Sequence, residues 1–534
     1  MSSSPCDVLI IGAGHNGLVC AWYLAARGLK VTMLERRHVV GGASVTEEFA
    51  PGFRNSTASY TVSLLNPRVI EDMRLYVHGL KVVLRKIDNF LPTLGADHLL
   101  SGRGGLTRRE IARHSAKDAK GYDAYSAALE PVVRILKQWI LRAPPNAGGG
   151  IADMFSALSL GNSVRGLDAE EQRNLFDFFT KSAGDILDRY FETDIVQALF
   201  GFDAVVGNYA SPYAPGSAYV LLHHLFGEAA GVPGAWGHAI GGMGAITEAM
   251  ARAAKAKGVE IVLDAPVSEL IVEDGRAVGA VAGGRAYRAK AVAANVNPNH
   301  LFASLVPQGA VAPEIERRMA GWSAESATFR MNVALSELPR FTSLPQPGDH
   351  LTAGVIIAPS LGYMDRAFTS ARSEGWAREP IVEMLIPSTL DGTLAPPGAH
   401  VASLFCQHFP YEVDGGWEAR VDEAADHVIA HVERYAPGFK ASVVGRLALS
   451  PWHLEQRFGI PRGDIFHGKM GLDQLFSARP MLGHADYRMP LPGLYLCGSG
   501  AHPGGGVTGA PGHNAARAIL SDMRRFPGRR RVDG

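Results

Sequence analysis

Three glycines near the start of the chain have the spacing of a dinucleotide-binding turn. Gly12, Gly14 and Gly17 follow the apolar run 8–11, and a helix rich in small residues comes next. Gly12 allows a tight turn, Gly14 lets the backbone approach a pyrophosphate, and Gly17 lets the helix pack closely on the strand. The unpaired N–H groups and the positive dipole end of the helix then face the phosphates. The chemistry indicated is the binding of a dinucleotide.

A second strand and the acid after it complete this βαβ unit and favour FAD. The strand covers residues 31–34 and ends at Glu35, whose carboxylate can bind both ribose hydroxyls. An acid at this position disfavours the 2′-phosphate of NADP. Arg36 follows, and the pair Gly41-Gly42 resembles the extended FAD signature of flavoproteins of the glutathione-reductase and amine-oxidase type.

The size and composition are those of a soluble enzyme with more than one domain. The 534 residues exceed the ~100–200 of an ordinary domain. Hydrophobic residues make up 47% and charged residues 19%, and the net charge of zero gives no field that attracts nucleic acid. The four cysteines form no CxxC pair, no metal-ligand spacing occurs, and no apolar run reaches the ~18 residues of a membrane span. We expect a cytoplasmic protein with no metal and no nucleic-acid partner.

A segment in the middle of the chain supplies further parts of the nucleotide-binding sheet. It begins at Gly241-Gly242 and continues as a predicted helix over 245–257. Apolar runs on both sides of Asp274-Gly275 predict a hairpin. Val267 opens the first of these runs, at the kind of position whose backbone meets adenine in such folds.

A third segment near the end repeats the order strand, glycine-rich loop, helix. The strand covers 493–498, and the helix that runs to Leu520 points its N-terminus at whatever the loop holds. In flavoproteins this is the N1–C2=O edge of isoalloxazine, where negative charge gathers on reduction. Glycines 504–506 predict a backbone that passes close to a flat ring, and Val507 follows them.

These segments enclose two long insertions. We predict a discontinuous FAD-binding domain over 1–72, 234–310 and 485–534, and a substrate domain over 73–233 and 311–484. The first insertion is predicted to be mainly helical, at 121–141 and 170–200, and the second to hold strands at 328–335, 382–386 and 401–407. The fold class is therefore α/β: a Rossmann-type FAD-binding domain of the glutathione-reductase/amine-oxidase kind with an inserted α+β substrate domain.

Taken together, the motifs resemble the phytoene desaturase family of FAD flavoproteins. The resemblance is carried by GAGHNGL with LERR, by GGMGAITEAMARAA and by HPGGGVTGAPGHNAARAIL. In the insertions, PSTLD at 387–391 with APPG at 395–398, and IFHG at 465–468 with LDQ at 472–474, are similar to one branch. That branch holds pyridine nucleotide-disulfide oxidoreductase domain-containing protein 2 and the oxygen-dependent β-carotene ketolases.

The resemblance implies non-covalent FAD, hydride transfer at flavin N5 and a long apolar substrate such as a carotenoid, another polyene or a lipid. It also implies peripheral membrane contact for many members and a mitochondrial location for eukaryotic ones. Oxygen, a quinone and nicotinamide all stay open as electron acceptors. The residues predicted to bind the cofactor are Gly12, Gly14, Asn16, Gly17, Glu35, Arg36, Gly41, Gly42, Val267, Gly498, Gly505, Gly506 and Val507.

Two histidines are the candidates for catalysis. His502 precedes Pro503 in the loop that should cover the flavin, where it serves either as proton shuttle or quinone contact, or only to hold the loop. His467 and Gln474 match family positions, with a catalytic and a structural role equally open. A polyene channel or core packing would explain Tyr213, His223, His224, Trp236 and His238. Membrane contact or buried helix faces would explain the apolar runs 154–160 and 221–226.

The function expected first is an FAD-dependent oxidoreductase of the desaturase or dehydrogenase type. A flavin amine or amino-acid oxidase shares the same nucleotide domain and stays open. A flavin-bound regulatory or interaction protein with little turnover is the third candidate.

Overall fold

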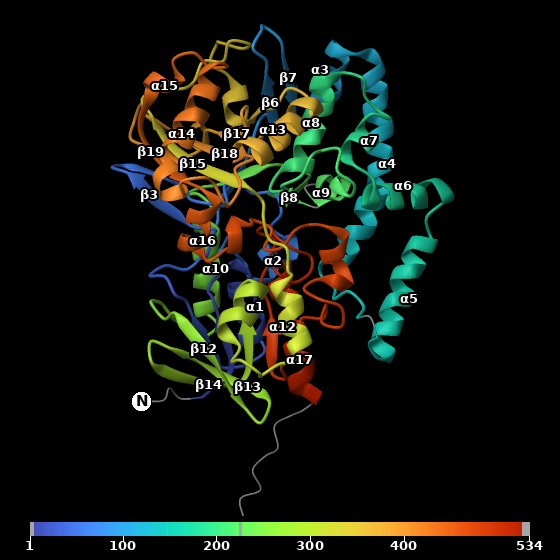
Figure 1. Cartoon of the computed structure of the whole chain (residues 1–534), viewed down its shortest axis with the longest axis vertical. Coiled ribbons are helices and arrows are strands. Elements are labelled where there is room, and N and C mark those ends of the chain that lie inside the picture. The colour runs from blue at the N-terminus through green and yellow to red at the C-terminus, as the bar shows by residue number, and fades with distance from the viewer. Residues whose placement is uncertain (1–4, 147, 224–226, 526–534) are drawn as a thin grey trace, which may run out of the picture.

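The computed structural model describes residues 5–146, 148–223 and 227–525 and shows two lobes, each built around a seven-stranded sheet. The first sheet lies in the lower lobe of Figure 1 and the second in the upper lobe, and a group of helices runs along one side of both. Strands of the first sheet come from residues 6–34, 260–294 and 494–496, and those of the second from 89–101 and 328–449. The boundaries assigned to the two domains stay a prediction.

The first sheet has the strand order β11-β2-β1-β14-β13-β12, and β20 pairs with β14. Strands β11, β2, β1, β14 and β20 run parallel, whereas β12 and β13 are antiparallel additions at one edge. Strand β1 is buried on both faces, which is why its sequence is a continuous apolar run and does not alternate. The strands are β1 Cys6–Ile11, β2 Val31–Leu34, β11 Glu260–Val262, β12 Val267–Glu273, β13 Arg276–Ala282, β14 Arg285–Ala294 and β20 Leu494–Leu496.

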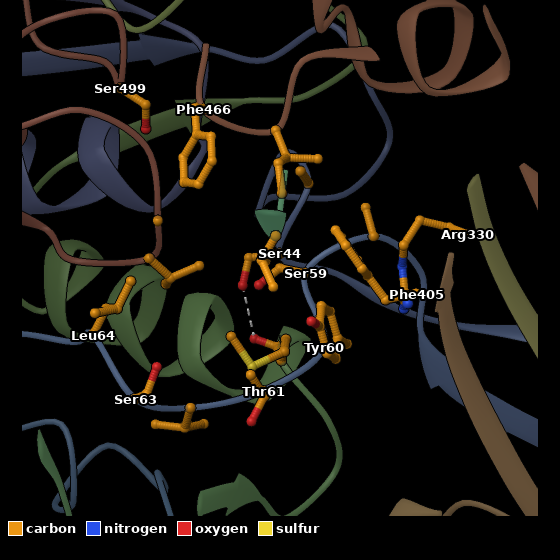
Figure 2. Close-up of a pocket in the computed structure, with 18 of the residues that line it drawn as sticks. Ser44, Ser59, Tyr60, Thr61, Ser63, Leu64, Arg330, Phe405, Phe466 and Ser499 are labelled. Atoms are coloured by element: carbon orange, nitrogen blue, oxygen red, sulfur yellow. Dashed lines mark hydrogen bonds between the residues drawn. The ribbon is translucent and has the colours of Figure 1, made fainter. Parts of the chain in front are cut away.

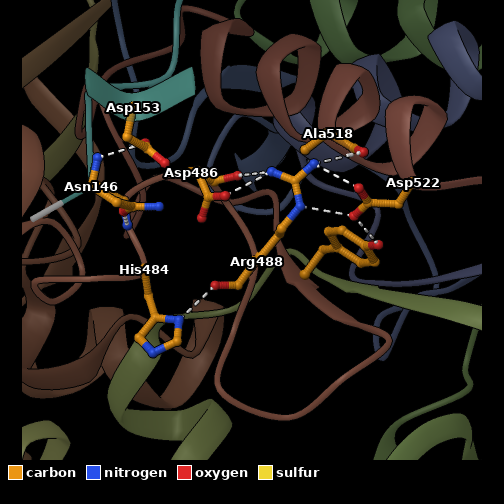
Figure 3. A network of polar contacts seen from close by, with 9 residues as sticks. Asn146, Asp153, His484, Asp486, Arg488, Ala518 and Asp522 are labelled. Atoms are coloured by element: carbon orange, nitrogen blue, oxygen red, sulfur yellow. Dashed lines mark hydrogen bonds and ion pairs between the residues drawn. The ribbon is translucent and has the colours of Figure 1, made fainter. Parts of the chain in front are cut away.

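Three helices, α1 (His15–Ala25), α10 (Gly244–Lys255) and α17 (Ala510–Arg525), pack beside one another in the lower lobe. The contact between α1 and α17 is close, since a Cβ at Gly512 would lie 2.0 Å from the carbonyl oxygen of Asn16. Arg488 secures the far end of α17 by ion pairs to Asp486 at 2.7 Å and Asp522 at 2.8 Å and by a hydrogen bond to the Ala518 carbonyl (Figure 3). The end of α17 that lies away from the glycine-rich loop is thus fixed to the segment before β20.

The second sheet has the order β19-β15-β18-β17-β16-β6-β7. Strands at 328–335, 382–386 and 401–407 were predicted, and the structure confirms all three within one residue. The first insertion, predicted to be mainly helical, adds β6 and β7 to this sheet, which the sequence analysis missed. The strands are β6 Asn89–Pro92, β7 His98–Ser101, β15 Thr328–Leu335, β16 Gly354–Ile357, β17 Ile381–Leu385, β18 His400–Gln407 and β19 Val443–Leu449.

The helices of the first insertion differ from the prediction in one place. The helix expected at 121–141 is α4, Ala116–Ile140, and the region 170–200, expected to be helical, is helical but divided. Three helices cover most of residues 169–205: α6 (Ala169–Thr180), α7 (Ala183–Leu187) and α8 (Asp194–Val205). The break follows from Ser182, whose hydroxyl and backbone form a capping box with Asp185 that starts α7 as a new helix.

The remaining elements are short strand pairs and helices that belong to both lobes. The short strand pairs are β3 Thr46–Ala50 with β4 Phe53–Ser56, β5 Val82–Leu84 with β10 Gly237–Ala239, and β8 Glu228–Ala229 with β9 Val232–Pro233. The other helices are α2 Pro67–Asp72, α3 Leu106–His114, α5 Ile151–Arg165, α9 Ser217–His223, α11 Pro298–His300, α12 Pro313–Ala320, α13 Leu361–Glu374, α14 Trp417–Glu433, α15 Phe439–Ser442 and α16 Pro451–Phe458. Among the described residues, none of the helices has the length and apolar character needed to cross a bilayer.

Candidate cofactor and substrate site

Two cavities adjoin where the lobes meet. A cleft of about 1030 Å³ lies at the carboxyl ends of the parallel strands β1 and β2, and a second cavity of about 1260 Å³ extends toward the second sheet. His15, Ala43, Ile460, His467 and Ser499 line both of them. The carboxyl edge of a parallel sheet is where α/β proteins bind their ligands, so the cleft has the position of a cofactor site.

The glycine-rich turn after β1 forms the floor of the cleft. Gly12 has a left-handed φ of +93°, which a side chain would strain, and a Cβ at Gly17 would lie 2.3 Å from the carbonyl oxygen of Gly12. Gly14 precedes α1 and provides no side-chain cap, so the first N–H groups of the helix have no partner from this residue. Gly12 and Gly14 line the cleft, whereas Gly17 serves the contact between helix and turn.

Glu35 is fixed at the edge of the cleft by two main-chain donors. It is 5% exposed, its Oε2 accepts a hydrogen bond from Ala13 N–H at 2.7 Å, and its Oε1 accepts one from Arg37 N–H at 3.0 Å. A carboxylate has about four acceptor positions, so two remain for ligand hydroxyls. Arg36 also lines the cleft and donates to the carbonyl of Arg457 at 2.7 Å.

The glycine pair and Val267 close the cleft from its other sides. Gly41 pairs with Gly14 through a backbone bridge, and a Cβ on Gly41 would lie 2.6 Å from the carbonyl oxygen of Ser44. Gly42, with a φ of +59°, and Val267, the first residue of β12, both line the cleft.

Asn16 and Gly498 lie beneath the cavities and line neither of them. The Asn16 amide donates to the Ser499 hydroxyl at 3.1 Å and so ties α1 to the loop after β20. A Cβ at Gly498 would lie 3.0 Å from Oδ1 of Asn295. Both residues therefore hold the cofactor loops together.

The glycines before α17 have different neighbours. A Cβ at Gly505 would lie 2.5 Å from Cα of Phe466. Gly505 itself lines neither cavity. Protein therefore occupies the space at Gly505, and none is left there for a flat ring. Gly506 has a φ of +96° and lines the larger cavity together with Val507.

His15 and His467 stand where the two cavities meet. Burial lowers the pKa of His15 to about 4 and that of His467 to about 3, so both rings are neutral at neutral pH. Within the described residues, Nε2 of His15 has no hydrogen-bond partner. Arg479 positions the segment before His467 by donating to the carbonyls of Phe466 at 2.7 Å and Ser499 at 2.9 Å. In the sequence, the position of His15 inside the glycine motif gives no separate signal for a role at the cavities.

His502 lies away from both cavities. Its Nε2 is 3.1 Å from the carbonyl of Trp139 in α4, its own carbonyl accepts from the Tyr487 hydroxyl at 2.9 Å, and burial lowers its pKa to about 4. Of the two roles that were open, these contacts support the one of holding the loop. Gln474 is likewise structural, since its side chain accepts from Ser323 N–H at 2.7 Å and donates to the Ser323 carbonyl at 2.9 Å.

The larger cavity has mostly apolar walls and one charged region (Figure 2). Arg330, Phe405 and Glu383 lie directly opposite one another on the adjacent strands β15, β18 and β17. The Tyr60 hydroxyl donates to Glu383, and Asp203 of α8 lines the same cavity. The apolar lining residues include Val62, Leu64, Leu65, Phe202, Val206, Ile246, Phe405, Leu454, Ile460, Ile465, Phe466 and Val507.

The charged region perturbs the two carboxyl groups. Burial, with a contribution from Glu383, raises the pKa of Asp203 from its ordinary 3.8 to about 8. Burial also raises the pKa of Glu383, and Arg85 opposes this. The corresponding signal in the sequence is a single charged residue inside each of two strands that hold no other charge.

Of the residues predicted to line a channel, Trp236 alone lines the larger cavity. His238 pairs with Asp391 at 3.0 Å, Tyr213 is 45% exposed, and His223 lines a separate small cavity. His224 and the end of the run 221–226 lie outside the described residues. In α5, Met154, Phe155 and Leu158 are exposed, so buried helix faces do not explain that run.

The described residues contain no cluster of His, Cys, Asp or Glu that could hold a metal ion. All four cysteines are unpaired and buried.

Comparison with known proteins places the chain among flavoproteins. Residues 17–328 match the family described as flavin containing amine oxidoreductase. The chain is 41% identical to pyridine nucleotide-disulfide oxidoreductase domain-containing protein 2 of Rattus norvegicus, over 97% of this chain and 94% of that protein. It is 27% identical to one of the polypeptides of limonene dehydrogenase from Castellaniella defragrans, over 97% and 95%. It is 25% identical to phytoene desaturase (lycopene-forming) of Pantoea ananas, over 96% and 99%.

Solved structures show the same fold. An oxidoreductase from Methanosarcina mazei has a TM-score of 0.60 at 15% identity and covers 96% of this chain and 100% of its own. Cyclohexylamine oxidase from Brevibacterium oxydans has a TM-score of 0.60 at 16% identity, over 98% and 100%. At these identities the likeness concerns the fold alone.

Proposed function

Because the chain belongs to the flavin-containing amine oxidoreductases and is an FAD-dependent oxidoreductase, we propose that it desaturates or dehydrogenates a long apolar, polyene-like or lipid-like substrate. The observation that carries the proposal is the larger cavity, whose walls are mostly apolar and which adjoins the cofactor cleft. Burial of an apolar chain against such walls contributes roughly 25 cal/mol per Å². The electron acceptor stays open.

The names of two relatives support an apolar substrate. Limonene dehydrogenase and phytoene desaturase are named for limonene and phytoene, which are unsaturated hydrocarbons. The solved amine oxidase shares only the fold at 16% identity and gives no argument for an amine.

The residues of the cleft fit FAD. The cleft has three features that FAD requires. They are a tight glycine turn on which the first helix packs closely at Gly17, a helix N-terminus without a side-chain cap and a buried carboxylate at the cleft edge. We propose that the N–H groups of the Gly12–Gly14 turn and α1 bind the pyrophosphate, that Glu35 binds the ribose hydroxyls and that the Val267 backbone contacts adenine. Val507 and the N-terminus of α17 would face the pyrimidine edge of the ring. When bound, FAD supplies the hydride chemistry.

The chain itself orients the substrate and excludes water. His15 and His467 remain neutral at the junction of the cavities, so they hold no charge that an apolar chain would have to desolvate. Phe202, Phe405 and Phe466 supply flat apolar walls. We propose that His467 positions the substrate and that His502, which lines neither cavity, takes no part in the chemistry.

The test is an anaerobic titration of the holoprotein with carotenoids, retinoids and unsaturated lipids in micelles, following the absorbance of oxidised flavin. We expect one of these classes to bleach the flavin. Rapid formation of hydrogen peroxide with simple amines would instead favour an amine oxidase. Flavin that no organic compound reduces, together with a stable protein partner in pull-downs, would favour a regulatory protein.

A further inference from the structure

One wall of the larger cavity carries buried positive charge. Arg330 is 1% exposed and lies across the Tyr60 ring, with its guanidinium carbon 4.5 Å from the ring centroid. Its terminal nitrogens donate to the Leu404 carbonyl at 2.7 Å and the Ser403 hydroxyl at 2.8 Å. Within the described residues its Nε has no partner. A buried donor without a partner is costly, so this nitrogen marks a place where a ligand acceptor fits.

A second arginine stands behind this wall. Arg85 is 3% exposed and donates to the Thr61 hydroxyl, and its Nη1 has no partner among the described residues. A Cβ built on Gly354 would lie 3.3 Å from this nitrogen and 2.9 Å from Glu383 Oε1, so the two groups are close neighbours.

The charges of this wall do not cancel. Arg85, Arg103 and Arg330 bring three positive charges, and the carboxyls that act on them are those of Glu383 and Asp88. Because Asp203 holds its proton at neutral pH, it adds no negative charge to these two carboxyls. Uncompensated positive charge away from water is strongly unfavourable unless an anion neutralises it.

We propose that Arg330, with Arg85 behind it and Asp203 beside it, binds the carboxylate of a long-chain unsaturated acid. The substrate is then an acid, and it differs in its polar end from a hydrocarbon or an amine. This inference rests on the proposed function, because it assigns one end of the substrate for which the apolar walls provide the rest. Figure 2 shows Arg330 and Ser499 on opposite sides of the cavity, and Ser499 lies at the junction with the cofactor cleft.

The aromatic rings of this wall argue against an ammonium group. A substrate cation would use the faces of Tyr60 and Trp236. Arg330 already covers Tyr60, and the Arg85 guanidinium carbon is 5.5 Å from the centroid of Trp236. A further positive charge here would meet two arginines.

The experiment compares four molecules of the same chain length: linoleate, linoleyl alcohol, linoleylamine and the corresponding hydrocarbon. Each is titrated into the anaerobic holoprotein in micelles, and its Kd is taken from the change in the flavin spectrum. We expect linoleate to bind about 10- to 100-fold more tightly than the alcohol, the size of a charge-assisted hydrogen bond. Arg330→Met should remove this preference, and Arg330→Lys should retain part of it.

Phe202→Leu is the matched control, because it changes the apolar wall of the same cavity and should weaken all four ligands to a similar degree. Equal binding of acid and alcohol to the wild type overturns the carboxylate site but leaves the apolar substrate standing. An unchanged preference for the acid in FAD-loaded Arg330→Met also overturns it. If none of the four binds, the proposed function fails as well.

A second variant keeps the test decisive if Arg330→Met does not fold. The titratable groups that face Asp203 are Glu383 on β17 and Tyr125 on α4, with Arg330 on β15 lining the same cavity. Above about pH 8 Asp203 ionises and repels a carboxylate, so the preference for linoleate should fall. Asp203→Asn cannot ionise and should keep the preference. The same fall in both proteins, or no fall in the wild type, contradicts the proposal.

Discussion

Replacing Asp203 by Asn should stabilise the protein, and increasingly so as the pH rises from 5 to 7. Burial, and secondarily Glu383, raises the pKa of this carboxyl from 3.8 to about 8. Between these values the folded chain keeps the proton and the unfolded chain releases it. The unfolded state then binds fewer protons, and stability falls with increasing pH. Asn carries no such proton and removes this dependence at the site.

The magnitude follows from the displacement of the pKa. One pH unit within the window corresponds to about 1.4 kcal/mol, so the cost of Asp203 is about 1.5 kcal/mol at pH 5 and about 4 kcal/mol at pH 7. An unfolding entropy of roughly 2.1 cal/mol/K per residue gives about 1.1 kcal/mol/K for 534 residues. Tm of Asp203→Asn should therefore exceed that of the wild type by about 1–2 °C at pH 5 and about 4 °C at pH 7.

The assay is thermal unfolding of both proteins, saturated with FAD, followed by circular dichroism at pH 5, 6 and 7. Asp274→Asn is the control, because Asp274 is exposed in the hairpin turn between β12 and β13 and should show a difference that does not change with pH. A gap between Asp203→Asn and wild type that stays constant with pH would refute the reasoning. So would a variant less stable than the wild type at pH 7.

Four further outcomes are expected. Gly17→Ala should lower FAD content by roughly tenfold or more, because its Cβ would lie 2.3 Å from the Gly12 carbonyl, whereas Gly161→Ala, with open space around it, should retain FAD. Glu35→Gln should raise the Kd for FAD about 10- to 100-fold in fluorescence titration, and an unchanged Kd would contradict the ribose assignment. Arg488→Met should lose about 1–2 kcal/mol, seen as a lower Tm, because it leaves two carboxylates without their partner. Phe155→Asp should reduce sedimentation with lipid vesicles if α5 contacts membranes, since Phe155 is 62% exposed; equal sedimentation would argue against that contact.

The sequence predicts the nucleotide-binding part well because local rules determine it. The turn at Gly12, the contact at Gly17 and the edge position of Glu35 each follow from short spacing in one βαβ unit, and the structure shows the geometry of each. The same holds for the Asp274-Gly275 turn, where a positive φ at both residues fits the hairpin.

The larger cavity could not be predicted in the same way, because its residues meet only through tertiary packing. Arg330 and Glu383 become neighbours through the register of β15, β17 and β18, and Asp203 arrives from a helix of the other insertion. The catalytic role of His502 stays a prediction, because proximity to the glycine-rich loop in sequence does not decide on which side of that loop a ring lies. Its contact with α4 is a long-range one.

The order in which the first sheet is assembled limits when the protein can take up its cofactor. Strand β20 and α17, which complete the sheet and the loop beside it, are translated after nearly all other residues. At about 5–20 residues per second, β1 and its glycine turn wait roughly 25–100 s for these partners. During that interval β14 lacks its neighbour β20, because this pairing is late and long-range. The cofactor cleft therefore cannot be complete before the segment that holds Ser499, just after β20, has been made.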